Sequence, residues 1–316
     1  MKSIVIYFSQ SGNTKKIAQA IHSGMSRSGD QCDIARLKDV AAEDLAGYDL
    51  IGIGTPVYWG RETANMTGFI ESWLPLDGKH GFAFCTHGAL PSFFMARVVP
   101  AMEQRGLTVV GWNDWFGSVV YPVIPKPYFT DGHPDEIDLK EAEDFGREMV
   151  ERSRRIYQGE TKLIPVLPKG KAYDAIYNPP GRVSEMPLEE RVKFVHWETC
   201  MQFKLDPKKC KYPKCTHCID NCPTNSIELS LDPPVFTKGN LCITCYLCEQ
   251  TCPQGAIEAD MEGLQKGHDP YVHPVLMKSL EGFEALGHFR RLTPLDKIGW
   301  DTPFWKRKKP RFKISY

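Results

Sequence analysis

Eight cysteines between residues 210 and 253 are spaced as metal ligands. The second of their two runs follows the pattern C-x2-C-x2-C-x3-C-P and comprises Cys242, Cys245, Cys248, Cys252 and Pro253. The first run comprises Cys210, Cys215, Cys218 and Cys222, whose last three members each lie 30 positions before Cys245, Cys248 and Cys252. Two-residue gaps let a tight loop turn three thiolates toward one core, and the fourth ligand must come from elsewhere. This spacing predicts cages for iron–sulfur cubanes, whereas zinc sites rarely use eight cysteines in two such runs.

The repeat resembles the bacterial two-cluster 4Fe–4S ferredoxin domain, in which the fourth cysteine of each run serves the other cluster. The resemblance implies two ligand sets: Cys210, Cys215, Cys218 and Cys252 for cluster one, and Cys242, Cys245, Cys248 and Cys222 for cluster two. The position 30 residues before Cys242 is Tyr212, so Cys210 serves cluster one only if its loop carries two extra residues. Cys200 stays open as the alternative ligand.

A hydroxyl-rich loop follows the first apolar run of the chain. Residues 3–8 have the character of a buried strand, and residues 15–29 carry a helical apolar stripe. Between them lie Ser9, Ser11, Gly12, Asn13 and Thr14. A loop between a strand and a helix start offers backbone N–H groups to a phosphate. Neither a Walker loop nor a G-x-G-x-x-G dinucleotide fingerprint is present. A plain helix capped by Asn13 or Thr14 is the competing interpretation.

Alternating strands and helices predict the architecture of the first half. Further strands are expected at 31–37, 49–54, 81–86 and 107–121, and helices at 62–73, 93–104 and 135–157. This order predicts an α/β fold with a doubly wound, five-stranded parallel sheet. Ligands of such sheets bind at the carboxyl ends of the strands, where the loops 9–14, 55–60 and 86–93 fall.

Residues 1–158 are therefore similar to a flavodoxin-like domain, and this resemblance implies FMN. Its phosphate would be held by Ser9, Ser11, Gly12, Asn13 and Thr14. Its ring would be flanked by Thr55, Pro56, Val57, Tyr58, Trp59, Gly60, Thr86, His87, Gly88 and Phe93. Tyr58 or Trp59 is expected to stack on the ring, and His87 to be a hydrogen-bonding loop residue rather than a proton donor. Cys32 and Cys85 fall in expected strands and are predicted to be buried.

Four segments follow from these motifs. They are a flavodoxin-like domain at 1–158, a packed linker at 159–195, a small α+β ferredoxin domain at 196–260 and a C-terminal extension at 261–316. A helix is expected at 189–207 and another near 274–291, before a basic tail. Lys+Arg and Asp+Glu both number 39, which argues against a general nucleic-acid binder. No signal peptide and no membrane-spanning run are recognised, which favours the cytoplasm, and an anaerobe suits such clusters.

The whole layout resembles the EFR-type flavodoxin–ferredoxin fusions, which are iron–sulfur flavoproteins. We expect two 4Fe–4S clusters and FMN to relay electrons between a low-potential ferredoxin and a partner oxidoreductase. An FMN-dependent reductase of a quinone, nitroaromatic or oxygen, fed by the clusters, stays open as an alternative. A redox sensor or assembly module is a third hypothesis. The sequence leaves open whether the chain forms a homodimer.

Overall fold

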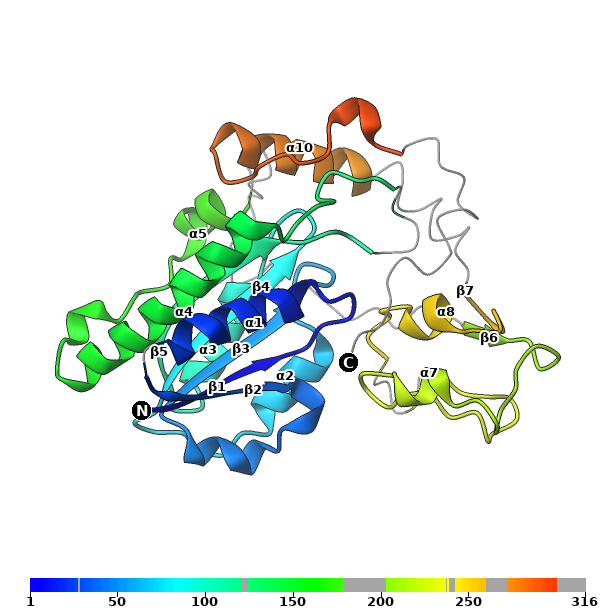
Figure 1. Ribbon diagram of the computed structural model, residues 1–316, viewed down its shortest axis with the longest axis horizontal. Helices are drawn as coiled ribbons and strands as arrows, with labels where there is room; N and C mark the ends of the chain where they lie inside the picture. Colours follow the sequence, from blue (N-terminus) through cyan, green and yellow to red (C-terminus); the bar gives the residue numbers. More distant parts are fainter. Residues whose placement is uncertain are drawn as a thin grey trace.

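A five-stranded parallel sheet forms the centre of the first half of the chain (Figure 1). The computed structural model describes residues 1–27, 29–120, 124, 126–178, 203–236, 238, 242–259 and 272–299. The strand order is β2-β1-β3-β4-β5, and every neighbouring pair is parallel. This is the flavodoxin-like order, with its switch point between β1 and β3. The predicted fold class is confirmed.

The strands of this sheet are β1 (Lys2–Tyr7), β2 (Gln31–Arg36), β3 (Leu50–Pro56), β4 (His80–His87) and β5 (Thr108–Phe116). The helices of the same half are α1 (Asn13–Ser26), α2 (Ala64–Glu71), α3 (Phe94–Glu103), α4 (Glu136–Tyr157) and α5 (Gly170–Tyr177). The second half contains β6 (Phe203–Leu205), α7 (His217–Asp220), α8 (Leu247–Thr251), β7 (Ile257–Ala259) and α10 (Val272–Ala285). Short 3-10 turns lie at Leu37–Asp39, Ala42–Gly47, Thr161–Leu163 and Leu295–Lys297.

Two expected elements need correction. The fifth strand ends at Phe116 instead of reaching residue 121, because the chain leaves the sheet once β4, its partner, ends at His87. Residues 203–205 form a strand, not the end of a helix, because Phe203 and Leu205 pair with β7 and pack in the core of the second half. The rest of that expected helix, with His196, Trp197 and Cys200, lies outside the described residues.

The two cysteines outside the repeat lie in strands, as expected. Cys85 is fully buried in β4, one of the inner strands of the sheet. Cys32 is only partly buried, because its strand, β2, forms the edge of the sheet and is less covered than the inner strands. The prediction of burial is therefore confirmed for Cys85 and wrong for Cys32.

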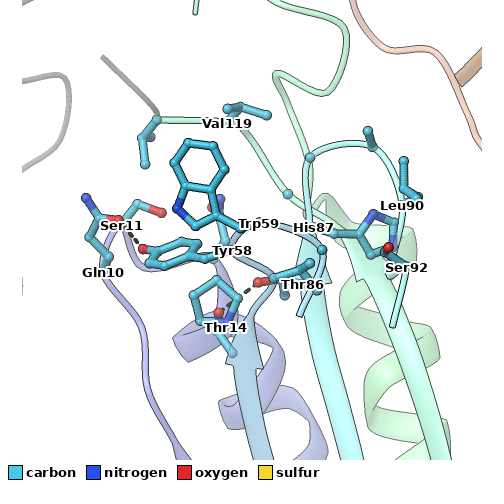
Figure 2. Close-up of a pocket in the computed structure, with 18 of the residues that line it drawn as sticks. Gln10, Ser11, Thr14, Tyr58, Trp59, Thr86, His87, Leu90, Ser92 and Val119 are labelled. Atoms are coloured by element: carbon cyan, nitrogen blue, oxygen red, sulfur yellow. Dashed lines mark hydrogen bonds between the residues drawn. The ribbon is translucent and has the colours of Figure 1, made fainter. Parts of the chain in front are cut away.

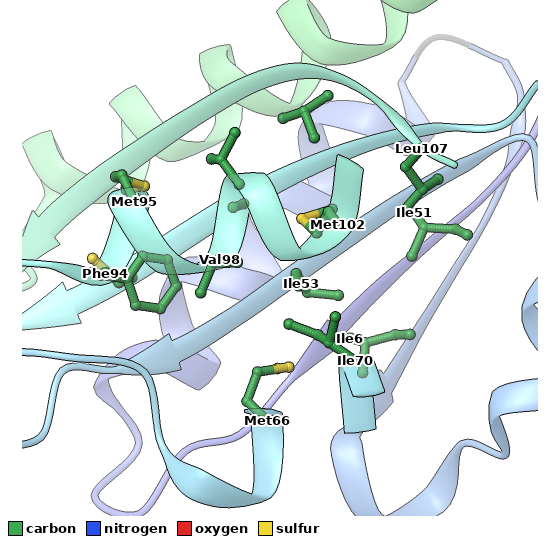
Figure 3. Packing of buried hydrophobic residues seen from close by; sticks show 14 of the residues in the cluster. Ile6, Ile51, Ile53, Met66, Ile70, Phe94, Met95, Val98, Met102 and Leu107 are labelled. Atoms are coloured by element: carbon green, nitrogen blue, oxygen red, sulfur yellow. The ribbon is translucent and has the colours of Figure 1, made fainter. Parts of the chain in front are cut away.

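Helices cover both faces of the sheet. Alternate strand residues point to opposite faces, so Val5 packs with α1 and α4 while Ile4 and Ile6 pack with α2 and α3. Figure 3 shows the second face, where α3 lies over the strands and presents Phe94 and Val98 to Ile53. On the first face α1 approaches α4 closely. A Cβ at Gly24 would lie 1.9 Å from the carbonyl oxygen of Glu143, which only glycine avoids.

The segment after α4 packs on the sheet domain through two tyrosines of α5. Tyr173 is fully buried and donates its hydroxyl hydrogen to the carbonyl of Ser92 at 2.7 Å. The hydroxyl of Tyr177 accepts a hydrogen bond from the indole of Trp112 at 2.8 Å. These contacts anchor the connection toward the cysteine-rich part of the chain beside the 86–93 loop.

The cysteine-rich part forms a small unit beside the sheet (Figure 1). Strands β6 and β7 pair antiparallel, and α7 and α8 lie within the two cysteine runs. Its core is formed by apolar side chains together with the cysteines themselves. Helix α10 packs on another edge of the sheet domain, where Leu280 and Phe283 join Leu90 and Phe129 in one cluster. Among the described helices, none is both long and apolar enough to cross a membrane.

Candidate cofactor site

The loop after β1 leaves the start of α1 open to an anion. The cap position of the helix is Gly12, which has φ 97° and provides no side-chain cap, so the competing interpretation of an Asn13 or Thr14 cap is wrong. The Asn13 amide instead donates to the carbonyl of Ser118 at 2.8 Å. The hydroxyls of Thr14 and Thr86 share a hydrogen bond of 2.7 Å. First-turn N–H groups without a side-chain acceptor are the donors that a phosphate uses.

A cavity of about 680 Å³ lies at the carboxyl ends of the strands. Most of the residues expected to bind a cofactor line it: Ser11, Asn13, Thr14, Pro56, Val57, Tyr58, Trp59, Gly60, Thr86, His87, Gly88 and Phe93. Three expected residues are not in its lining. Ser9 accepts a hydrogen bond from the backbone of Gly12 at 3.1 Å, and Thr55 is buried and bonds to the Pro56 carbonyl. Ser9 and Gly12 line a separate, smaller cleft instead.

Trp59 occupies a turn that holds its indole at the cavity. Tyr58 and Arg61 exchange backbone hydrogen bonds of 2.9 and 3.1 Å, which closes a tight turn around Trp59 and Gly60. Trp59 has φ 54° and a side chain that is 44% exposed, although it lines the cavity. Figure 2 shows its indole above the ring of Tyr58, between Ser11 and Val119. An aromatic held in the left-handed region at a cavity points to a functional constraint on this turn.

Tyr58 connects the cavity to the cysteine-rich unit. Its hydroxyl donates to the side-chain oxygen of Gln10, and the amide of Gln10 donates to the backbone carbonyl of Cys245 at 2.6 Å. Burial and the neighbouring Cys245 thiol raise the pKa of Tyr58, so it stays a neutral donor. Cys245 and Thr244 themselves line the cavity. Thr244 and Tyr246 both have positive φ, at 49° and 58°, so the backbone on either side of Cys245 is sharply turned.

His87 closes the end of β4 beside the cavity. Its Nε2 lies 2.8 Å from a carboxylate oxygen of Asp114, and the ring packs edge-on against Phe116. The other ring nitrogen, Nδ1, is buried without a hydrogen-bond partner in the described part of the chain. A buried polar atom of this kind is available to a bound group.

Several lining residues were not singled out from the sequence. They are Gln10, Ala89, Leu90, Ser92, Gly117, Ser118, Val119, Val120, Ile124, Asn178, Thr244 and Leu276, while Cys245, which also lines the cavity, was singled out only as a cluster ligand. The first four belong to the expected loops at the strand ends. The segment 117–120 follows β5, so the rule that ligands bind at strand ends could have identified it. Asn178, Thr244 and Leu276 come from outside the sheet domain, and no local pattern marks them.

Electrostatic contacts among the thiols gather them into two sets. Burial raises the pKa of Cys218 to about 11, and the nearby thiols of Cys252 and Cys210 contribute to this rise. Burial likewise raises the pKa of Cys245 to about 12, with Cys242 and Cys222 contributing. Cys218 and Cys245 thus each lie near the last cysteine of the other run, while Cys248 interacts with Cys245, Cys242 and Cys222 and also with Cys218. Thiols gathered so closely disfavour each other's charge, which a bound cationic core would relieve.

Backbone hydrogen bonds give the two runs the same local geometry. The N–H two residues after Cys242 donates to its sulfur at 3.4 Å, and the N–H of Tyr212 does the same for Cys210 at 3.4 Å. The sulfurs of Cys222 and Cys252 each accept from the N–H four residues later, both at 3.3 Å. Cys210 and Cys242 thus share this local hydrogen-bond feature although their spacing to the next cysteine differs. Such N–H···S bonds are among the groups that tune iron–sulfur clusters.

A second cluster of side chains that could bind a metal ion is already bonded to an arginine of the same chain. His133, Asp135 and Asp138 offer atoms within 4.8 Å of one another. The guanidinium of Arg290 bonds both carboxylates at 2.7–2.8 Å, and the backbone carbonyl of Arg290 lies 2.8 Å from His133 Nε2. The arginine supplies the positive charge that a metal would bring, so this cluster fastens the C-terminal segment to the start of α4.

Comparison with known proteins places the first half in a family. A flavodoxin domain model matches residues 4–92. An NAD(P)H dehydrogenase (quinone) of Rhodopseudomonas palustris is 32% identical over 147 residues, covering 37% of this chain and 73% of that protein. A flavodoxin structure from the domain Archaea is 25% identical and covers 49% of this chain and 99% of that one, with a TM-score of 0.40. Over its first half the chain belongs to the flavodoxin-like family.

The cysteine-rich part has a relative of its own. An uncharacterised ferredoxin of Methanocaldococcus jannaschii is 34% identical over 62 residues, covering 20% of this chain and all of that protein. The chain therefore joins a flavodoxin-like domain to a segment similar to a ferredoxin. A flavodoxin-like domain is a flavoprotein module.

Proposed function

We propose that this protein is an iron–sulfur flavoprotein that relays electrons between a low-potential ferredoxin and a partner oxidoreductase. FMN would lie in the cavity at the strand ends, with its phosphate at the open start of α1 and its ring beside Trp59. Two 4Fe–4S clusters would be held by the two thiol sets. Bound flavin accepts one or two electrons and clusters pass one at a time, so the pair would match one-electron and two-electron partners.

The observation that carries this proposal is the contact between the cavity and the second cysteine run. Cys245, which we assign to cluster two, lines the same cavity as Trp59 and Tyr58. The Gln10 amide holds its carbonyl at 2.6 Å. A flavin in this cavity would thus share a wall with a cluster ligand of the same chain, which favours electron transfer within one molecule.

The chain's own residues would prepare the cavity for this role. Tyr58, with its raised pKa, stays protonated and keeps its hydrogen bond to Gln10 in place. The first-turn N–H groups, with the one hydroxyl hydrogen that the Thr14–Thr86 pair does not use between its own two oxygens, offer neutral donors to a phosphate, so no side-chain charge is needed there. The apolar wall from Val119 and Leu90 excludes water from one side.

Anaerobic single-turnover mixing tests the proposal. The purified chain is first assayed for iron, sulfide and FMN, and then mixed with one equivalent of a dithionite-reduced ferredoxin while flavin absorbance is followed. We expect the flavin to be reduced in the native chain, and the rate to fall at least tenfold in Cys245→Ala. Cys85→Ala is the matched control, because Cys85 is a fully buried thiol of the sheet core that belongs to neither set. A flavin that stays oxidised in the fully loaded protein would refute the relay.

A reductase of a small acceptor is the second candidate. The relative from Rhodopseudomonas palustris is named as a quinone-reducing enzyme, and the indole of Trp59 is partly exposed at the cavity. Sustained, saturable turnover with a soluble quinone would favour this function over the relay. A rate that rises only linearly with quinone concentration would count against it.

A further inference from the structure

The segment that carries the first cysteines of cluster one is surrounded by lysines. Between residues 204 and 214 the chain has five lysines, Lys204, Lys208, Lys209, Lys211 and Lys214, and a single acid, Asp206. All five lysines are exposed. Within the described part of the chain, only Lys209 of the five makes an ion pair, with Asp206 at 3.2 Å and Glu258 at 3.9 Å. We call these five lysines the lysine collar.

The collar lies directly on the ligands of cluster one. The N–H of Cys215 donates to the carbonyl of Lys211 at 3.1 Å, and the N–H of Tyr212 donates to the sulfur of Cys210 at 3.4 Å. Tyr212 is 37% exposed and Pro213 is exposed beside it. An exposed aromatic centre with a polar rim is common in protein interfaces, and charges around it guide a partner of opposite charge.

A different part of the ferredoxin-like unit lines the cavity proposed for the flavin. Thr244 and Cys245 line that cavity, and residues next to Cys222 line the smaller cleft against the β1–α1 loop. Hydrogen bonds that residues 206–215 make with other described residues all stay within the ferredoxin-like unit. In Figure 1, α8 lies nearer to the sheet domain than the β6–β7 pair does. The residues that would hold cluster two therefore include the one that lines the cavity, so cluster two would be the inner cluster and cluster one the outer one.

We infer that the lysine collar is the docking surface for a small acidic redox protein that exchanges electrons with cluster one. This inference rests on the proposed function, because it assumes that cluster one is present. The occupant is set by charge: four exposed lysines without an acidic partner in the described chain attract a surface rich in carboxylates. The zero formal charge of the whole chain, 39 basic against 39 acidic residues, makes the collar a local feature rather than a general polyanion-binding property. In the exchange one electron leaves the acidic protein and one reduces cluster one, with no bond made or broken.

A charge-reversal comparison tests the collar. The collar variant is Lys208→Glu/Lys211→Glu/Lys214→Glu in the full chain. The control variant is Lys162→Glu/Lys169→Glu/Lys171→Glu, which changes the net charge equally at three exposed lysines near α5. The probe is a small acidic two-cluster ferredoxin, whose reduced form is mixed anaerobically with each protein at ionic strengths from about 0.01 to 0.5 M.

We expect the second-order rate constant of the native chain to fall steeply as salt rises. The collar variant should react about 10–100-fold more slowly at low salt and lose most of this salt dependence, while the control stays within about twofold. Calorimetric binding of the oxidised ferredoxin, which involves no turnover, should weaken in parallel. Equal losses in both variants, or no loss in the collar variant, would overturn the inference.

Two further readouts distinguish docking from an effect on the cluster potential and from general polyanion binding. If the lysines only adjust the potential of cluster one, the midpoint of a redox titration will shift while ferredoxin binding does not, and docking is then wrong. Tighter binding to phosphatidylserine vesicles or to a single-stranded oligonucleotide than to the ferredoxin would also overturn it. The proposed function fails separately, when iron, sulfide or flavin is missing or when dithionite-reduced clusters do not reduce the flavin. Ferredoxin binding that depends on the lysine collar would still be observed if the dithionite-reduced clusters did not reduce the flavin.

Discussion

Replacement of Trp59 by alanine should weaken flavin binding by a predictable factor. Trp59 is 44% exposed, and a tryptophan presents about 250 Å² at most, so a flavin covering this part would remove about 110 Å² from water. At about 25 cal/mol per Å² this burial contributes about 2.7 kcal/mol, and half that coverage about 1.4 kcal/mol. The dissociation constant of FMN should therefore rise about 10–100-fold. Alanine keeps the backbone cost of φ 54° similar, so the loss reports on the ring.

The assay is a titration of the FMN-depleted full chain with FMN, followed by quenching of flavin fluorescence. Trp59→Phe keeps an aromatic face and should lose less than about fivefold. Tyr58→Phe removes only the hydroxyl bonded to Gln10 and should leave FMN affinity within about threefold while disturbing the contact with Cys245. A change below twofold in Trp59→Ala would refute the stacking role of this residue. It would also show that the indole is not covered by the bound ring.

Helix packing and pH provide further tests. Gly24→Ala should destabilise the chain by about 1–3 kcal/mol, because its Cβ meets α4. Gly68→Ala, in an exposed and open position of α2, should stabilise the chain by about 0.4–1 kcal/mol. Denaturant unfolding measures both free energies, and similar effects of the two variants would contradict the close approach of α1 to α4. Burial opposes the charge of His133, but its bonds to Asp138 and the Arg290 carbonyl outweigh this and raise its pKa. The stabilisation by protonated His133 should then be complete below about pH 6.5 and disappear as pH rises through the higher folded-state pKa. Backbone amides near Arg290 should therefore be more protected from hydrogen exchange on acidification. The variant His133→Gln should abolish that pH dependence.

The sheet was predictable because its signals are local. Buried parallel strands are continuous apolar runs, and the helices between them have a regular stripe, so order and fold class follow from the sequence. Strand ends were less predictable, because β5 stops where its partner β4 stops. Strand β6 was missed because three residues hold too little pattern, and only pairing with β7 makes them a strand. The partial exposure of Cys32 likewise depends on the place of β2 at the sheet edge, which its own residues do not encode.

Only those lining residues of the cavity that belong to the sheet domain were predictable from the sequence. The loops after β1, β3 and β4 carry recognisable residue types, and most of their expected side chains line the cavity. The contact of Gln10 with Cys245 joins residues 235 positions apart, so no local motif could indicate it. The spacing alone left both Cys210 and Cys200 open as the counterpart of Cys242, because two extra residues separate Cys210 from Cys215. The N–H···S bonds that the sulfurs of Cys210 and Cys242 both accept favour Cys210.

The exchange of cysteines between the two runs links the collar to the cavity. Cys252, from the run that faces the cavity, lies with Cys218 and Cys210, and Cys222, from the collar run, lies with Cys242. Neither cluster could then form without both runs in place, so the two cluster sites would fold together. The hydrogen bond from Gln10 to the Cys245 carbonyl ties the second run to the sheet domain. If both clusters are present, an electron from a partner docked on the lysines would pass through cluster one and cluster two before it reaches the flavin.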